Sequence, residues 1–160
     1  MSANTSRPHV YVLPEDDANR ELANGFHQEV ALTRQRQMQV LPPAGGWTKV
    51  LKDFESEHVK EMDRCRYRFM VLLIDFDEDP NRLTQAKAAI PERLANRVLI
   101  LGVWSEPEKL KPHLGACETI GVGIAKDCRD GTNTTWGHPL LQHNATEVER
   151  FREQIRTILF

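Results

Sequence analysis

The sequence feature that most constrains the fold is an unbroken apolar run, Phe-Met-Val-Leu-Leu-Ile, at residues 69–74. A strand with one face in water alternates apolar and polar side chains, so this run is typical of a strand that is covered on both faces. Residues 98–103 form a second apolar run of the same kind. Such strands occur in parallel sheets with helices on both sides, and this arrangement is therefore expected.

Shorter strands are predicted at residues 9–13 and 38–41, each of which is followed by proline. The strands are separated by segments in which apolar residues recur at helical spacing. Three of these segments are expected to be helices that begin near Glu15, Trp47 and Leu83. Strands and helices that alternate in this way indicate βαβ units.

Local signals predict where helices begin and end. Gly25 lies near the expected stop of the first helix, and capping boxes are expected at 105–108 (Ser-x-x-Glu) and 144–147 (Asn-x-x-Glu). Residues 115–137 are rich in Gly, Thr and Asn and are expected to be irregular. The closing helix has one apolar face, made by Val148, Phe151, Ile155 and Ile158.

Together these elements predict a single α/β domain over residues 1–160, a three-layer sandwich with a mainly parallel, Rossmann-like sheet and a closing C-terminal helix. The three cysteines lack paired spacing and are interpreted as free thiols. No apolar run is long enough to span a bilayer, and no apolar signal segment opens the chain. A cytoplasmic protein without a membrane partner is therefore expected.

Two clusters of acidic residues follow predicted strands. The clusters are Glu15, Asp16 and Asp17 after the first strand, and Asp75, Asp77, Glu78 and Asp79 after the third. Ligands of open α/β sheets bind beyond the carboxyl ends of the strands, so the clusters are expected to converge there. In an extended segment Asp75 and Asp77 point the same way and can share a hard cation such as Mg²⁺. The alternative is a plain acidic turn, which an Asp-Pro sequence favours.

The stretches Val-Tyr-Val-Leu-Pro-Glu-Asp-Asp at 10–17 and Val-Leu-Leu-Ile-Asp-Phe-Asp-Glu-Asp at 71–79 resemble a Toprim domain, which occurs in topoisomerases, primases and overcoming-lysogenization-defect (OLD) nucleases. The resemblance covers residues 9–115 and leaves 116–160 as a helical extension. It implies nuclease-type processing of phosphodiester bonds with Mg²⁺ or Mn²⁺. The metal site that it implies contains Asp75, Asp77 and Asp79, while Glu15 or Asp17 handles protons or a second ion.

Two registers of this resemblance stay open. In the first, Glu15 takes the position of the family's glutamate and acts as general acid or base, with Asp16 where glycine is usual. In the second, Leu13 takes that position, and Glu15, Asp16 and Asp17 match acidic residues downstream of it in some members. The second register implies an inactive, Toprim-like subunit.

A weaker resemblance, to the receiver domain of two-component signalling, gives the alternative function. An acidic pair after the first strand, an acceptor aspartate, a hydroxyl residue and a lysine occur in the receiver order at Asp16, Asp75, Ser105 and Lys126. This resemblance implies phosphorylation of Asp75. The alternative to an enzyme is therefore a non-catalytic α/β interaction subunit or a receiver-like signalling domain.

The charge balance predicts a protein partner. The chain has 21 Lys plus Arg and 23 Asp plus Glu, a formal net charge of −2, so by itself it neutralises phosphates poorly. A DNA or RNA substrate is thus expected to require an ATPase or a nucleic-acid-binding subunit, as Toprim-like modules often do. The region from Trp136 through the closing helix is expected either to dock that partner or to pack on the chain's own sheet.

Overall fold

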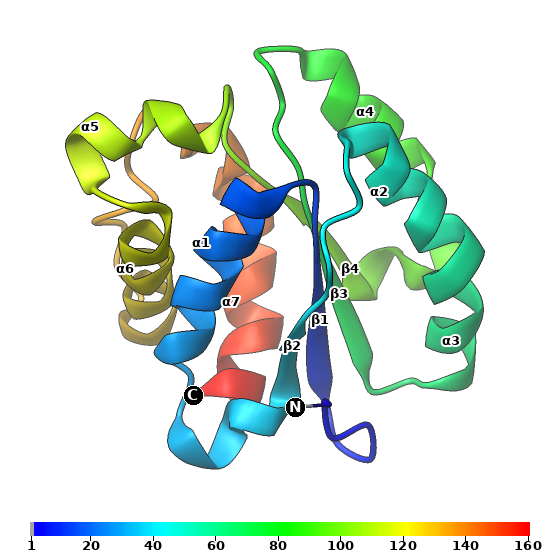
Figure 1. Ribbon diagram of the computed structural model, residues 1–160. Helices are drawn as coiled ribbons and strands as arrows, with labels where there is room; N and C mark the ends of the chain where they lie inside the picture. The colour runs from blue at the N-terminus through cyan, green and yellow to red at the C-terminus, as the bar shows by residue number, and fades with distance from the viewer. Residues whose placement is uncertain (1) are drawn as a thin grey trace.

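A computed structural model of the protein, which describes residues 2–160, contains a four-stranded sheet between two layers of helices (Figure 1). The strands are β1 (His9–Pro14), β2 (Met38–Val40), β3 (Arg68–Leu73) and β4 (Val98–Leu101). They lie in the order β2-β1-β3-β4, and all three pairings are parallel. The predicted α/β class is confirmed, and the apolar run at 69–74 supplies most of the interior strand β3.

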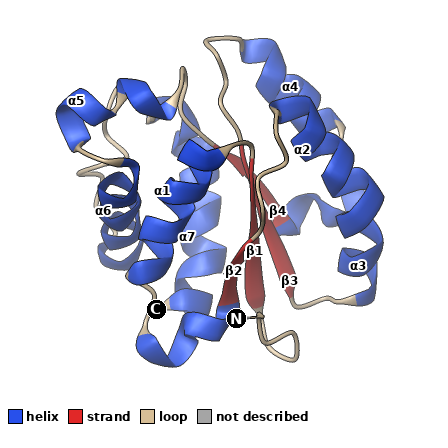
Figure 2. Cartoon of the chain, viewed as in Figure 1, coloured by secondary structure: helices blue, strands red, loops and turns tan. Residues whose placement is uncertain are grey.

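Helices cover both faces of the sheet (Figure 2). They are α1 (Asp17–Gln28), α2 (Trp47–Asp53), α3 (Val59–Arg64), α4 (Pro80–Ala88), α5 (Lys111–Leu114), α6 (Cys117–Asp130) and α7 (Ala145–Leu159). A π-helical turn, Phe54–His58, joins α2 to α3. Helices α1, α6 and α7 form one layer, and α2, α3 and α4 form the other. The segment expected as a helical extension thus supplies two helices of one layer.

Alternate side chains of the strands enter the two halves of the core. Val12, Val71 and Leu99 pack toward α1, α6 and α7, whereas Met70, Leu72 and Ile100 pack toward α2, α3 and α4. Both faces of β3 and β4 are therefore buried, as their unbroken apolar sequences predict.

The expectation that residues 115–137 are irregular is wrong for most of this segment, because it contains α6. Gly25 lies near the end of α1, as expected, but the helix continues past it to Gln28. The glycines of both helices have a packing role, because α1 and α6 cross at Gly25 and Gly121. A Cβ on Gly25 would lie 2.0 Å from the Glu118 carbonyl oxygen, and one on Gly121 would lie 2.0 Å from the Leu22 carbonyl oxygen. These glycines permit close backbone packing and do not break the helices.

The loop after α6 folds around the carboxylate of Asp127, which is 2% exposed. This carboxylate accepts hydrogen bonds from the backbone N–H groups of Thr134, Thr135 and Trp136 at 3.1, 2.7 and 3.0 Å, and from the Thr132 hydroxyl at 2.5 Å. One buried side chain therefore satisfies the backbone donors of a loop that has no regular structure of its own.

Neither predicted capping box forms. Within residues 2–160, the short 3₁₀ turn Pro107–Lys109 has no side-chain cap, and the buried Ser105 hydroxyl has no hydrogen-bond partner. Asn144 precedes α7, but its side-chain amide donates to the Gly102 carbonyl at 2.8 Å and its oxygen accepts from the Gly102 N–H at 3.2 Å. The polar side chains of the second pattern, Asn144 and Glu147, point toward the sheet and bond backbone groups there.

The outer edge of β4 is paired with side chains of α7 and of the residue before it. The Glu147 carboxylate accepts from the Ile100 N–H at 2.9 Å, and Arg150 donates to the Val98 carbonyl at 3.4 Å. Arg150 also donates to Glu147 at 2.7 Å. We call Asn144, Glu147 and Arg150 the edge ladder, because they bond the strand edge as a fifth strand would.

The C-terminal region packs on the chain's own sheet and is not a free docking surface. Most of its large apolar side chains are buried, among them Trp136, Val148, Phe151, Ile155 and Ile158, whereas Leu140 and Phe160 are partly buried. Among residues 2–160, no helix combines the length and the apolar character needed to cross a membrane.

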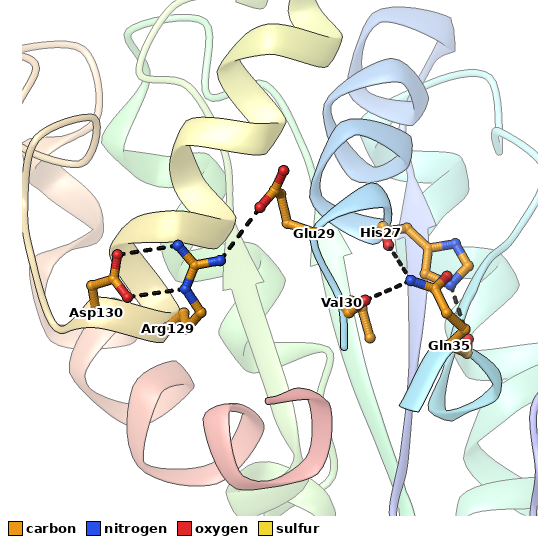
Figure 3. A network of polar contacts seen from close by, with 6 residues as sticks. All are labelled: His27, Glu29, Val30, Gln35, Arg129 and Asp130. Atoms are coloured by element: carbon orange, nitrogen blue, oxygen red, sulfur yellow. Dashed lines mark hydrogen bonds and ion pairs between the residues drawn. The ribbon is translucent and has the colours of Figure 1, made fainter. Parts of the chain in front are cut away.

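A polar network fastens the end of α1 to its neighbours (Figure 3). Arg129 of α6 pairs with Asp130 at 2.9 Å and with Glu29 at 3.4 Å. The Gln35 amide donates to the carbonyls of His27 and Val30, and the His27 ring bonds the Gln35 carbonyl at 2.9 Å. This network lies at the end of the molecule where the N- and C-termini are marked, away from the carboxyl ends of the strands (Figure 1).

Candidate functional site

The carboxyl ends of β1 and β3 bring the two acidic clusters together. The strands pair in register up to Pro14 and Leu73, and the Glu15 N–H donates to the Leu73 carbonyl at 2.9 Å. The Glu15 carboxylate then accepts from the Asp75 N–H at 2.7 Å. The predicted convergence therefore occurs between Glu15 and Asp75.

Asn19 links the acidic residues across the two strands. Asp16 is the N-cap of α1, and its carboxylate accepts from the Asn19 N–H at 2.9 Å. The Asn19 side-chain amide donates to the carboxylates of Asp16 and Asp75, each at 3.0 Å. Asn19 is 0% exposed, and its side-chain oxygen has no partner among residues 2–160. We call Glu15, Asp16, Asn19 and Asp75 the acid site.

The acid site holds more negative charge than its surroundings stabilise. Burial raises the pKa of Asp75 to about 7, the hydrogen bond from Asn19 opposes this rise, and the charges of Glu15, Asp16 and Glu108 add to it. Burial likewise raises the pKa of Glu15, against the hydrogen bond from the Asp75 backbone. Carboxylates gathered in this way favour uptake of a proton or of a cation.

Three of the predicted site residues lie outside this arrangement. The Asp17 side chain is 79% exposed and pairs with Arg20 at 2.9 Å. The Asp79 carboxylate accepts from the Asn81 N–H at 2.9 Å as the N-cap of α4. The Asp77 side chain is 79% exposed and pairs with Arg82 at 3.3 Å.

The expectation that Asp75 and Asp77 point the same way is wrong, because the segment is not extended. Asp77 and Glu78 have left-handed backbone conformations, with φ of 50° and 58°. The Asp75 carboxylate contacts Asn19, whereas that of Asp77 pairs with Arg82. The alternation that applies to a strand ends where this turn begins.

Residues 2–160 contain no group of three or more His, Cys, Asp or Glu side chains placed to hold a metal ion. Mg²⁺ commonly binds through only one or two carboxylates and completes its shell with water and substrate phosphates. Two carboxylates of the acid site, those of Asp16 and Asp75, meet that smaller requirement in number, and the Asn19 side-chain NH₂ group donates to both. The donor atoms are all oxygens, which hard cations prefer.

Sequence reasoning missed Asn19, Arg82 and Trp47. Arg82 donates to the Asp75 carbonyl at 2.8 Å, and its guanidinium carbon lies 5.0 Å from the centre of the Trp47 ring. The available signal was spacing, since Asn19 and Arg82 each lie three residues after an N-capping aspartate, in the first turn of a helix. These positions belong to the site because their side chains contact Asp75, and a contact of this kind has no local pattern in the sequence.

Of the four residues of the receiver resemblance, Asp16 and Asp75 lie together in the acid site, and the Ser105 carbonyl accepts from the Asp77 N–H at 3.3 Å. Ser105 follows β4, but its hydroxyl is buried. Lys126 lies on an exposed position of α6, and the described sheet has four strands, so no fifth strand precedes this lysine.

Asp75→Asn is expected to be more stable than the wild type above neutral pH, by about 1–2 kcal/mol after solvent screening is allowed for. The pKa of Asp75 is raised from 3.8 to about 7 on folding, so the folded state keeps a proton that the unfolded state releases. Wild-type stability therefore falls as the pH rises from about 4 to about 7. Urea unfolding of both proteins across this range measures the difference, which should vanish near pH 4; equal differences at all pH values would contradict it.

No family model, no curated protein and no solved structure matches the chain. The Toprim and receiver resemblances therefore stay predictions from the sequence.

Proposed function

We propose that the protein is a Mg²⁺- or Mn²⁺-dependent enzyme subunit that acts on phosphodiester bonds, of the nuclease type, with the acid site as its reactive centre. The observation that carries this proposal is the convergence of three acidic residues at the ends of two adjacent parallel strands. The buried Asn19 donates to the carboxylates of Asp16 and Asp75, and the Glu15 carboxylate accepts from the Asp75 N–H. Ligand sites of open α/β sheets occur at this position. The resemblance of residues 10–17 and 71–79 to a Toprim domain supports the same chemistry.

The residues of the acid site divide into two roles. Asp75 and Asp16 are the carboxylates that would hold the cation, and Asn19 fixes their separation by donating to both. A bound divalent cation supplies charge stabilisation to the phosphate and activates water. Glu15, whose pKa is raised by burial, is the group that would take up or release a proton. Asp17, Asp77 and Asp79 are left outside this assignment, because their carboxylates have other partners.

A partner subunit is part of this proposal. The formal net charge of −2 and the acidity of the site both oppose the approach of DNA or RNA. An ATPase or a nucleic-acid-binding subunit would supply the positive surface. Since the apolar face of α7 is buried, such a partner would have to bind elsewhere on the molecule.

The test is calorimetric titration of Mn²⁺ into the wild type and Asp75→Asn, followed by cleavage of single-stranded DNA and RNA. We expect Asp75→Asn to lose detectable Mn²⁺ binding and to lower the cleavage rate about a hundredfold or more, since one cation ligand is removed. The matched control is Asp17→Asn, an exposed carboxylate of the same cluster, which should keep both properties. A wild type that binds no Mn²⁺, alone or in its native assembly, would falsify the proposal.

A further inference from the structure

We propose that Arg82 binds a phosphate group of the substrate, and that Asp77 occupies the same place in the free protein. This inference rests on the proposed function, because it adds the phosphate-binding residue of the acid site. It concerns a contact outside the carboxylates, and its test is separate from the test for metal.

Arg82 has hydrogen-bonding capacity to spare. A guanidinium group carries five N–H donors. Only two of these donors have partners among residues 2–160: one donates to the Asp75 carbonyl at 2.8 Å, and one donates to the Asp77 carboxylate at 3.3 Å. The Arg82 side chain is 18% exposed, so the remaining donors lie close to the protein surface without a partner in it.

The guanidinium is held in place before any ligand arrives. One face lies 5.0 Å from the centre of the Trp47 ring, a cation–π contact, while the Asp75 carbonyl fixes one edge. Arg82 thus joins α2, α4 and the segment after β3 at one point. A planar, oriented guanidinium is suited to the two-point recognition of phosphate.

Arg82 is also correctly placed for a substrate of the acid site. It donates to the Asp75 carbonyl at 2.8 Å, and the Asp75 N–H donates to the Glu15 carboxylate at 2.7 Å. The charge of Arg82 opposes the rise in the pKa of Glu15. A phosphate on Arg82 would therefore lie beside the acid site, where a cation on Asp75 and Asp16 could reach it. The positive guanidinium offsets the repulsion between that phosphate and the carboxylates.

Asp77 behaves as a removable anion. Its side chain is 79% exposed, the pair with Arg82 is 3.3 Å long, and exposed pairs of this kind contribute little to stability. The positive φ of Asp77 and Glu78 places this carboxylate over Arg82 by a tight turn. A phosphate, with more charge and more acceptor oxygens than a carboxylate, is expected to exchange with it.

The test measures binding of oligothymidine through the fluorescence of Trp47, with Mn²⁺ and with a chelator, alongside calorimetric titration of Mn²⁺ alone. Arg82→Ala is expected to weaken oligothymidine binding about tenfold or more but not to weaken Mn²⁺ binding, since it removes a positive charge from beside the acid site. Asp77→Asn, which removes the competing charge, is expected to tighten oligothymidine binding about two- to fivefold. The single variant Trp47→Phe shows how much of the fluorescence change comes from Trp47.

Several outcomes would overturn the inference: unchanged affinity in Arg82→Ala, or unchanged or weaker affinity in Asp77→Asn. Should Arg82→Ala fail to fold, Arg82→Lys keeps the charge but loses the planar fork, and affinity equal to the wild type would again overturn it. Failure of the proposed function gives a different result, since the wild type would then bind no Mn²⁺. Oligothymidine that binds through Arg82 in the chelator would still support the phosphate contact.

Discussion

Asp127→Ala is expected to lower the free energy of unfolding by about 3–5 kcal/mol. The substitution removes a carboxylate that is 2% exposed and accepts four hydrogen bonds from the loop after α6. The N–H groups of Thr134, Thr135 and Trp136 would lose their acceptor, and Trp136 would lose the anchor that fixes it in the core. Urea unfolding followed by tryptophan fluorescence measures the loss.

The matched control is Asp130→Ala, which changes an exposed aspartate of the same helix and should stay close to the wild type. Asp127→Asn is expected to fall between the two, because its amide oxygen can still accept but its NH₂ group faces backbone donors. A loss in Asp127→Ala no larger than that of the control would show that the loop holds its shape without this carboxylate.

Glu147→Ala is expected to lower the free energy of unfolding by about 2–4 kcal/mol. The Glu147 side chain is 6% exposed, accepts from the Ile100 N–H at 2.9 Å and pairs with Arg150 at 2.7 Å. Its removal leaves a backbone donor of β4 without an acceptor and takes the carboxylate from the half-buried Arg150 guanidinium, which keeps its bonds to the carbonyls of Ala95 and Val98. Chemical unfolding at neutral pH measures the effect.

Glu147→Gln separates the two contributions. Its amide oxygen can still accept from the Ile100 N–H, so the loss should be clearly smaller than in Glu147→Ala, and the difference reports the backbone bond. If both variants lose the same stability, the ion pair with Arg150 carries the effect and the edge ladder is less important than proposed.

The sheet was predictable because its signal is local. The apolar runs at 69–74 and 98–103 identify strands with both faces covered, and this property requires helices on either side. The predicted ends were less accurate: β4 runs from Val98 to Leu101 and does not reach residue 103.

The helices were predicted less well where glycine has a tertiary role. Gly25 and Gly121 indicate breaks when they are considered with their neighbours in sequence, but they lie at the α1–α6 crossing. Asn144 and Glu147 match a capping pattern, yet their side chains bond the backbone of Gly102 and Ile100 instead. In each case a contact distant in sequence overrides the local preference.

The acid site was predictable to the level of strand ends. That parallel strands end together was enough to expect Glu15 near Asp75. The direction of each carboxylate was not predictable, because it depends on Asn19, Arg82 and the left-handed turn at Asp77.

The edge ladder has a consequence for how the chain is made. β4 emerges from the ribosome well before α7, and until α7 is synthesised the outer carbonyl of Val98 and the outer N–H of Ile100 lack the partners that they have in the folded protein. An open strand edge in a nascent protein recruits other strands and leads to aggregation. Truncation before α7 should therefore give insoluble product even though every strand is present. Synthesis of α7 therefore covers the open edge of the sheet and removes the site at which other strands could pair.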